Sequence, residues 1–418
     1  MRIMIVTDQY PPIVGGVPTV THGLATALVE RGHTVSVVAP SCGTRDVRRL
    51  EDNVRVYRFS SFEWPTYKDL HIPFMPFLPL YNLIKRLDPD VIHIHSPIVL
   101  GNIAQFLASS LGKPIVATNH YLPINMSRSL ADDRLFGKSV SNITYGYLVY
   151  FCNWCQYVTA PTQTALNLLY KHGLHAPARA VSNGINLRVF SPGERDEELL
   201  RRFGLPTDRA LALHVNRLSE EKRVNVLLDA AAKTQSDTHI VLVGTGPAAE
   251  ELREQTRNLG LEKRVSFLGF VRDEDLLPLR RSCDFFVIPS VADLQSLSTM
   301  EAMACGLPVI AANAYALPEL AHHNENGFLF RPGNSAELAH DIDLLAGDKE
   351  LRSRMGAASL RIIAHHDSEK VLTEWEGIYQ RLANEFQDKR RQRRQQRLTR
   401  KNPNYVGQSS SQRDLPRG

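Results

Sequence analysis

Two series of short apolar runs, each run followed by a helical pattern, are the feature of this sequence that most constrains its fold. The first series has β-rich runs at residues 2–6, 34–39, 91–95 and 115–118. Strands that alternate with helices predict a parallel sheet covered by helices on both faces. The first half of the chain is therefore expected to be a wound α/β domain.

The same pattern starts again after Asn183-Gly184. The second series has runs at residues 210–215, 240–243, 265–268, 285–288 and 308–311. We predict an α/β protein with two facing, doubly wound Rossmann-like domains, residues 1–180 and 181–367. Ligands of such sheets bind beyond the carboxyl ends of the strands, so the site is expected in the cleft between the domains.

The end of the chain differs in composition from the rest. An amphipathic helix is predicted at residues 368–388, and the stretch 389–418 is Arg/Gln-rich and then rich in Asn, Pro, Ser and Gly, so we expect disorder. The whole chain has a net charge of +5, yet residues 389–418 carry ten Lys/Arg and one acid. The remaining residues have a net charge of −4, which argues against a nucleic-acid-binding body.

The cysteines and the uncharged segment bear on the compartment. The five cysteines are odd in number and scattered, which indicates a reducing, cytoplasmic environment. Cys152 and Cys155 form a C-x-x-C without a second pair, so buried thiols are expected rather than zinc ligands. Residues 139–170 contain no charged side chain, but their polar residues and Pro161 favour a buried helix and a core strand over a membrane span.

Charged residues follow two strands of the second series. Arg217 comes directly after the strand at 210–215, and Lys222 lies five residues further. Two cations at a strand end can hold a diphosphate and stabilise the charge that develops on a leaving group. Asp293 lies in the loop after the strand at 285–288. Surface ion pairs with neighbouring glutamates are the alternative for the two cations.

The helix after Asp293 offers further polar groups. It begins near Ser296 and Leu297, where free backbone N–H groups favour phosphate. Glu301 lies one turn into this helix and can accept hydrogen bonds from two ribose hydroxyls. The alternative for Glu301 is an acid that only interacts with the helix dipole.

Two glycine pairs stand between a strand and a helix. Gly15 and Gly16 follow the first strand, and Gly244 and Gly246 follow the strand at 240–243. The absence of a side chain allows backbone N–H groups to approach a phosphate or a nucleotide closely. A plain tight turn is the alternative for both pairs.

Histidines follow or lie within two strands of the first series. His120 comes after the strand at 115–118 and can hydrogen-bond a sugar hydroxyl there. His93 and His95 raise the possibility of zinc, but no carboxylate or cysteine stands at ligand spacing. The Asp-x-Asp pairs at 88–90, 273–275 and 341–343 are not at suitable strand ends. We expect no metal and no cofactor, with the cations taking the place of a metal.

Several motifs, in this order, resemble the retaining glycosyltransferases of family 4. They are GGV near the N-terminus, NGIN, NRLSEEK, VGTGP, FLGFV, and Asp293 separated by seven residues from Glu301, which is followed by AMACGLPVIA. The resemblance covers roughly residues 1–385. It implies the GT-B fold, with an acceptor domain followed by a nucleotide-sugar domain and a C-terminal helix that packs back on the first. It also implies metal-independent sugar transfer from a nucleotide sugar with retention of anomeric configuration.

The resemblance also implies a role for each matching residue. Gly16 approaches the donor phosphate, and His120 lies at the sugar ring. Arg217 and Lys222 neutralise the diphosphate, and Asp293 holds sugar hydroxyls. Finally, N–H groups come from Ser296 and Leu297, and Glu301 holds the ribose. The family's usual residues at two of these positions are different, Glu at 293 and Gly at 296.

The segments DLQSLSTMEAMACGLPVIA and TNHYLP are similar to bacterial members that glycosylate lipids. The expected donor is a UDP-hexose or GDP-mannose, and the expected acceptor is a membrane lipid such as a diacylglycerol or a phosphatidylinositol-type glycolipid. The basic tail is expected to reach an anionic membrane surface, so that the enzyme is cytoplasmic or peripheral on the inner face. The apolar segment 74–81 is expected as a buried loop, with membrane insertion as the alternative.

Two other functions remain open from the sequence. One is a glycosyltransferase that acts on a soluble or polysaccharide acceptor. The other is a nucleotide-sugar-binding protein, hydrolase or epimerase on the same fold, because a fold alone does not fix an activity. The oligomeric state is left open, and no specific nucleic-acid partner is expected.

Overall fold

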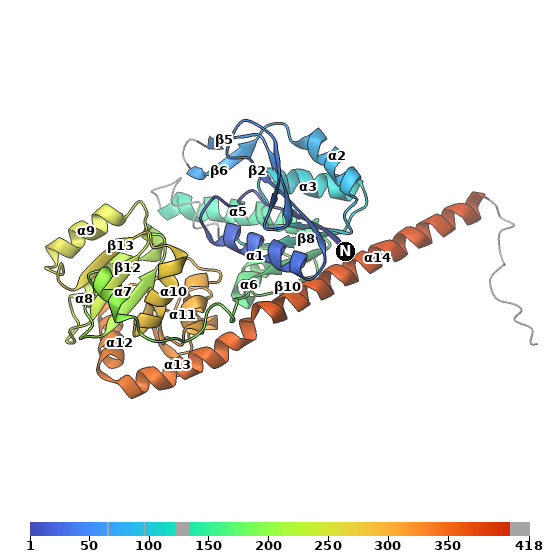
Figure 1. Cartoon of the computed structure of the whole chain (residues 1–418). Helices are drawn as coiled ribbons and strands as arrows, with labels where there is room; N and C mark the ends of the chain where they lie inside the picture. The colour runs from blue at the N-terminus through green and yellow to red at the C-terminus, as the bar shows by residue number, and fades with distance from the viewer. Residues whose placement is uncertain (65–66, 96, 123–133, 402–418) are drawn as a thin grey trace, which may run out of the picture.

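A computed structural model describes residues 1–64, 67–95, 97–122 and 134–401. Two α/β units, each built on its own sheet, lie side by side (Figure 1). Residues of both units line one cleft. The long C-terminal helix, red in Figure 1, packs on the first unit. The two-sheet architecture predicted from the alternation of strands and helices is thus confirmed.

The sheet of the first unit has eight strands and is parallel except at one edge. In spatial order its strands are β10 (Ala178–Ala180), β9 (Tyr157–Ala160), β8 (Ile115–Thr118), β7 (Val91–Ile94), β1 (Arg2–Val6), β2 (Thr34–Pro40), β4 (Val54–Phe59) and β3 (Val47–Glu51). Only β3 runs antiparallel to its neighbour. A separate hairpin pairs β5 (Ser61–Trp64) with β6 (Tyr67–Pro73). Because β1 has β2 on one side and β7 on the other, the strand order reverses at β1, where a ligand site is expected.

Helices lie on both faces of this sheet. They are α1 (Gly16–Glu30), α2 (Phe77–Leu87), α3 (Val99–Ser110), α5 (Arg134–Asn153) and α6 (Gln163–Lys171). Buried apolar side chains form a separate core on each face of the sheet, because β1 and its neighbours are apolar on both sides. The uncharged segment 139–170 forms the end of α5 and then β9 and α6. Cys152 and Cys155 are buried free thiols there.

The second unit has a six-stranded, fully parallel sheet. Its order is β13 (Val265–Gly269), β12 (His239–Val243), β11 (Leu211–Val215), β14 (Phe285–Ile288), β15 (Val309–Ala312) and β16 (Gly327–Phe330). The order reverses between β11 and β14, as in a dinucleotide-binding fold. Its helices and short 3₁₀ turns are α7 (Glu197–Arg202), η1 (Glu220–Lys222), α8 (Val224–Ala231), α9 (Ala249–Asn258), α10 (Asp273–Ser282), α11 (Leu297–Ala304), η2 (Leu317–Glu319), α12 (Ser335–Gly347), α13 (Lys349–Ile363) and η3 (Ala364–His366). One large core fills this unit.

The last helix, α14 (Ser368–Lys401), belongs by its contacts to the first unit. Its Leu372, Trp375 and Tyr379 are buried in the core that also contains Ile3 and Ile5. An ion pair of 2.7 Å between Arg31 and Glu369 ties the start of α14 to the end of α1. The chain therefore crosses from the second unit back to the first before it ends.

The tail differs from the sequence expectation up to Lys401. Disorder was expected from Lys389, yet α14 continues without a break to Lys401. Lys, Arg and Gln have high helix propensity, and no Pro or Gly occurs in the chain between Asp388 and Pro403. The expectation of disorder, which was based on the charged composition, is therefore wrong for residues 389–401. The rest of the predicted tail, residues 402–418, lies outside the described residues.

The apolar segment 74–81 is also different from the expected buried loop. Its second half forms the start of α2, and only part of it is covered, with Leu80 buried and Phe74 and Phe77 exposed. Among the residues described, no helix has the length and apolarity to cross a membrane.

Candidate active site

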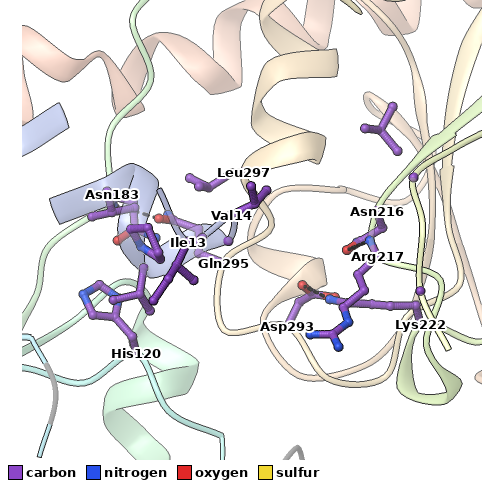
Figure 2. A pocket seen from close by; sticks show the side chains of 18 of the residues that line it. Ile13, Val14, His120, Asn183, Asn216, Arg217, Lys222, Asp293, Gln295 and Leu297 are labelled. Atoms are coloured by element: carbon purple, nitrogen blue, oxygen red, sulfur yellow. Dashed lines mark hydrogen bonds and ion pairs between the residues drawn. The ribbon is translucent and has the colours of Figure 1, made fainter. Parts of the chain in front are cut away.

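A cavity of about 750 Å³ lies in the cleft and is lined by residues of both units. It brings together nine of the residues that the sequence analysis singled out, namely Gly15, Gly16, His120, Arg217, Lys222, Gly244, Gly246, Asp293 and Leu297. Figure 2 shows the charged side chains gathered on the side of the second unit, with His120 and Asn183 opposite them. The cavity therefore lies between the two units, where the sequence analysis expected the cleft.

Lys222 and Asp293 form the charged centre of this wall. The Lys222 Nζ donates a hydrogen bond of 2.8 Å to Asp293 Oδ1, and both side chains are largely buried. The second carboxylate oxygen, Asp293 Oδ2, is buried without a hydrogen-bond partner within the described part of the chain. A buried oxygen of this kind favours a ligand that brings a donor group, such as a hydroxyl.

Arg217 lies beside this pair, at the end of β11 (Figure 2). The side chain of Asn216 fixes the turn, because its Oδ1 accepts a hydrogen bond of 3.0 Å from the Arg217 backbone N–H. Lys222 follows in η1, and the next residue, Arg223, has a positive φ of 52°. The strand end and the 3₁₀ turn therefore bring two cations to one wall of the cavity.

The two glycine pairs lack a side chain for different structural reasons. A Cβ on Gly244 would lie 1.9 Å from the Asn216 carbonyl oxygen, and one on Gly246 would lie 2.2 Å from that of Leu218. Backbone packing between the two loops therefore requires these glycines, whatever the ligand. A Cβ on Gly16 would meet nothing within 4 Å, so that position borders open space in the cavity. Open space of this kind fits the approach of a ligand to the start of α1.

Three histidines form a chain at the opposite wall, with His93 and His95 buried and His120 partly exposed to the cavity. His120 Nε2 lies 2.9 Å from His95 Nδ1, and the two rings are stacked. The rings of His95 and His93 are 3.9 Å apart, and His93 Nδ1 lies 2.7 Å from the Tyr379 hydroxyl of α14. Burial lowers the pKa of His120 to about 4 and holds the pKa of His93 and His95 well below the usual value. All three are therefore neutral at physiological pH.

This histidine chain is not arranged as a metal site. Within the described residues, no group of three or more His, Cys, Asp or Glu side chains is placed to hold a metal ion. The positive charge in the cavity comes instead from Arg217 and Lys222.

Glu301 and Ser296 lie away from the main cavity. Glu301 pairs with the buried guanidinium of Arg280, and it lines a neighbouring cavity of about 320 Å³. Burial raises the pKa of Glu301, and Arg280 opposes that shift. His120, Asn183 and Leu297 line both cavities. Ser296 caps α11, its Oγ accepting a hydrogen bond from the Thr299 N–H, and it is buried.

Polar residues that the sequence analysis missed also line the main cavity. They are Gln9, Asn183, Asn216, Thr245, Asp273 and Gln295. Asn183 is part of the NGIN motif, which offered a signal. Gln295 lies in the segment DLQSLSTME, but the sequence does not reveal its contact: its Oε1 accepts a hydrogen bond of 2.8 Å from the Asn183 N–H.

Asp8 is a further buried acid near this end of the sheet. It follows β1, and its Oδ1 accepts a hydrogen bond of 2.9 Å from the Leu100 N–H at the start of α3. Burial raises the pKa of Asp8 to about 7, although backbone N–H groups oppose the shift. Its position at a helix N-terminus explains a structural role without a ligand.

Two family models match the chain, one in each unit. The model described as "Glycosyltransferase Family 4" matches residues 14–189, and the one described as "Glycosyl transferases group 1" matches residues 195–361. Together they include the strands and loops that surround the cavity.

Characterised relatives match most of the chain. An alpha-monoglucosyldiacylglycerol synthase of Streptococcus pneumoniae is 29% identical over 74% of this chain and 71% of its own length. An N-acetyl-alpha-D-glucosaminyl L-malate synthase of Bacillus anthracis is 28% identical over 91% and 97%. A GDP-mannose-dependent alpha-mannosyltransferase of Mycolicibacterium smegmatis is 29% identical over 91% and 97%.

Solved structures share the fold. A sucrose-phosphate synthase from Thermosynechococcus elongatus superposes with a TM-score of 0.75 at 20% identity, over 91% of this chain and 98% of its own. HepE of Anabaena, solved in complex with UDP, gives a TM-score of 0.73 at 23% identity, over 90% and 99%. At these identities the likeness establishes the arrangement of the two units.

Proposed function

Since the chain belongs to the glycosyltransferases of family 4 and has their GT-B fold, we propose that it moves a hexose from a UDP-hexose or GDP-mannose to a lipid hydroxyl, with retention of configuration. The observation that carries this proposal is the group of Arg217, Lys222 and Asp293 at one wall of the cleft. Two cations and a carboxylate with one unpartnered oxygen match a leaving diphosphate next to a sugar hydroxyl.

The cations act on the leaving group. As the bond between the anomeric carbon and the diphosphate oxygen breaks, negative charge grows on that oxygen. Arg217 and Lys222 stabilise this charge without the reorganisation that water would need. The reaction on this proposal needs no essential metal, because the chain supplies the positive charge.

The acceptor hydroxyl attacks the anomeric carbon from the face that the diphosphate leaves. The new bond joins the acceptor oxygen to that carbon, and the hydroxyl proton passes to an oxygen of the departing diphosphate. On this mechanism the chain positions the reactants and stabilises charge, and a protein nucleophile is not needed.

The remaining site residues hold the donor in this proposal. Asp293 Oδ2 accepts a hydrogen bond from a sugar hydroxyl, and His120 offers a neutral ring to the sugar. Gly16 gives the donor phosphate access to the start of α1. Glu301 accepts from the ribose in the neighbouring cavity, and the backbone at Ser296 and Leu297 faces the phosphates. The second unit thus takes the nucleotide sugar and the first takes the acceptor.

A membrane lipid is the acceptor favoured by the relatives. The name of one of them, the alpha-monoglucosyldiacylglycerol synthase, states a lipid product. A lipid acceptor requires contact with a membrane, and the basic end of α14 supports that contact. We therefore place the working enzyme on the inner, cytoplasmic face of a membrane.

A soluble acceptor is the second candidate. The relative from Bacillus anthracis covers 91% of this chain, and its name states L-malate, a small soluble acid. A transfer assay separates the two candidates: radiolabelled UDP-glucose, UDP-galactose, UDP-N-acetylglucosamine and GDP-mannose are each offered with diacylglycerol in vesicles, with phosphatidylinositol in vesicles, or with malate. Label in the lipid phase supports the proposal. Label only in malate, or release of free sugar alone, contradicts it.

A further inference from the structure

An exposed apolar surface lies at the start of α2 and on the neighbouring α3. We call it the α2 apolar surface and define it by Phe74, Met75, Phe77, Leu78 and Phe106. Met75 is 90% exposed, Leu78 64% and Phe106 62%. The rings of Phe77 and Phe106 have their centroids 5.8 Å apart, so the exposed apolar side chains of α2 and α3 meet. Soluble proteins rarely leave such clusters open unless they bind something.

The backbone at Met75 holds that side chain outward. Met75 has a φ of 39°, in the left-handed region that an unbranched residue with a Cβ seldom occupies. Such a conformation carries a strain of roughly 1–3 kcal/mol and is kept only where surrounding structure imposes it. At Met75 this strain accompanies the exposure of an apolar side chain, and neither of them stabilises the folded chain.

Cations continue the outer face of α2 beyond the apolar part. Leu78, Tyr81 and Lys85 follow one another at spacings of three and four residues, and so share a face of the helix. The Lys85 ammonium lies 5.3 Å from the centre of the Tyr81 ring. Lys85 lies about 10 Å from Leu78 along the axis, at 1.5 Å per residue. That length is comparable with the depth of roughly 5–10 Å to which interfacial helices enter a bilayer.

More positive charge gathers beside the last turn of α2. The guanidinium groups of Arg86 and Arg48 lie 5.9 and 5.3 Å from the centre of the Tyr57 ring, on β4. Asp88 is the acid that follows the helix, and it forms ion pairs with Arg2 and Lys113. α2 thus has an apolar start and a basic end, which is complementary to the acyl chains and the phosphates of an anionic bilayer.

We propose that the α2 apolar surface inserts into the interfacial layer of an anionic phospholipid bilayer, with Lys85 and Arg86 at the level of the phosphates. This inference rests on the proposed transfer to a lipid acceptor, for which the first unit must meet the membrane. It is independent of the basic end of α14, which contributes charge but no comparable cluster of exposed apolar side chains among its described residues.

The test is binding of the full chain to vesicles in the absence of substrate. Wild type, the double variant Met75→Ser/Leu78→Ser and the control Leu344→Ser are sedimented with phosphatidylcholine vesicles, with and without phosphatidylglycerol. Leu344 is an exposed leucine of α12 in the second unit, far in the fold from α2. We expect the double variant to bind anionic vesicles at least about tenfold more weakly, because it loses two apolar side chains that the bilayer would bury. Leu344→Ser should bind as wild type does.

A second measurement fixes the meaning of that result. Thermal stabilisation by UDP and by GDP is recorded for all three chains, and all should respond equally, because the α2 apolar surface is remote from the cleft. Equal vesicle binding by wild type and the double variant would overturn the inference. A second result would also overturn it. In that result the double variant changes the oligomeric state of the chain in sedimentation velocity, while its vesicle binding stays equal to that of wild type.

The inference and the proposed function fail in different ways. If vesicle binding depends on Met75 and Leu78 but no lipid accepts label in the transfer assay, the surface stands and the lipid acceptor is wrong. If a lipid accepts label and the double variant binds vesicles normally, the acceptor stands and the surface is wrong.

Discussion

The Lys222 ammonium donates a hydrogen bond of 2.8 Å to Asp293 Oδ1 and thereby joins the loop after β11 to the loop after β14. These are the two strands between which the strand order of the second sheet reverses. The pair holds one carboxylate oxygen and leaves Asp293 Oδ2 buried and without a partner among the described residues. A sugar hydroxyl that meets Asp293 Oδ2 would therefore find its acceptor already oriented.

Lys222→Ala should lower turnover by about 10²–10³-fold, the loss expected when one preorganised donor to a developing charge is removed. Donor affinity should fall less, because Arg217 remains at the same wall of the cavity. Turnover and donor affinity are measured separately with the donor that the transfer assay identifies. Lys233→Ala is the matched control, since Lys233 is an exposed lysine of the same unit that binds Ser335. Full turnover in Lys222→Ala, or loss of wild-type activity in EDTA, would contradict the role.

Glu301→Gln should weaken binding of the nucleoside diphosphate by about 1.5–3 kcal/mol, the usual contribution of hydrogen bonds to a charged group. The structure adds a second effect, because Glu301 pairs with buried Arg280 and its loss should also lower the free energy of unfolding. Arg280→Gln separates the two effects. We expect it to lower stability in urea while leaving nucleotide affinity nearly unchanged. Equal affinity losses in both variants would assign Glu301 a structural role only.

The sequence predicted the cleft and nine of the residues that line it for a physical reason. Parallel strands bring their carboxyl ends to one edge, so residues that follow different strands, such as His120 and Arg217, could be expected near one cavity. The pairing of Glu301 with Arg280 could not be predicted, because it joins two helices whose mutual rotation depends on the core between them. The histidine chain was missed for the same reason, since His93 contacts Tyr379 of α14, 286 residues away.

Asp8 should contribute a loss of stability as the pH rises from about 4 to 7. Its pKa is raised from 3.8 to about 7 in the folded chain. In that pH range the folded state keeps a proton that the unfolded state releases, so deprotonation favours unfolding. Three pKa units correspond to a change of the order of 4 kcal/mol.

Asp8→Asn is the variant that isolates this effect. The amide keeps an oxygen for the Leu100 N–H and has no charge to bury. Urea unfolding at several pH values should show that the difference in unfolding free energy between Asp8→Asn and wild type grows with pH. A difference that stays constant from acid to neutral pH would show that Asp8 does not hold the proton.

His120 should act as a neutral ring throughout the physiological range. Its pKa is lowered to about 4 by burial, so protonation near the ordinary value of 6.5 is suppressed. The pH profile of kcat/KM should therefore lack a step from this group between about pH 5 and 8. His120→Asn should lower kcat/KM by roughly tenfold, as loss of one well-placed hydrogen bond predicts, without altering the profile. A step near pH 6.5 that disappears in His120→Asn would contradict this.

A chain that ends at Asp388 should bind anionic vesicles more weakly than the full chain. Residues 389–401 carry eight Lys/Arg and no acid, and each such charge contributes roughly 1 kcal/mol near an anionic leaflet. Neutral vesicles should not distinguish the two chains.

Because truncation also removes residues 402–418, the variant Lys389→Gln/Arg390→Gln/Arg391→Gln is the finer comparison, since Gln keeps a similar helix propensity without the charge. Salt weakens any attraction between charges, so the salt dependence of binding does not identify which charged residues contact the membrane. Equal co-sedimentation of the full and shortened chains with anionic vesicles would remove the basic end of α14 from membrane binding and leave sugar transfer untouched.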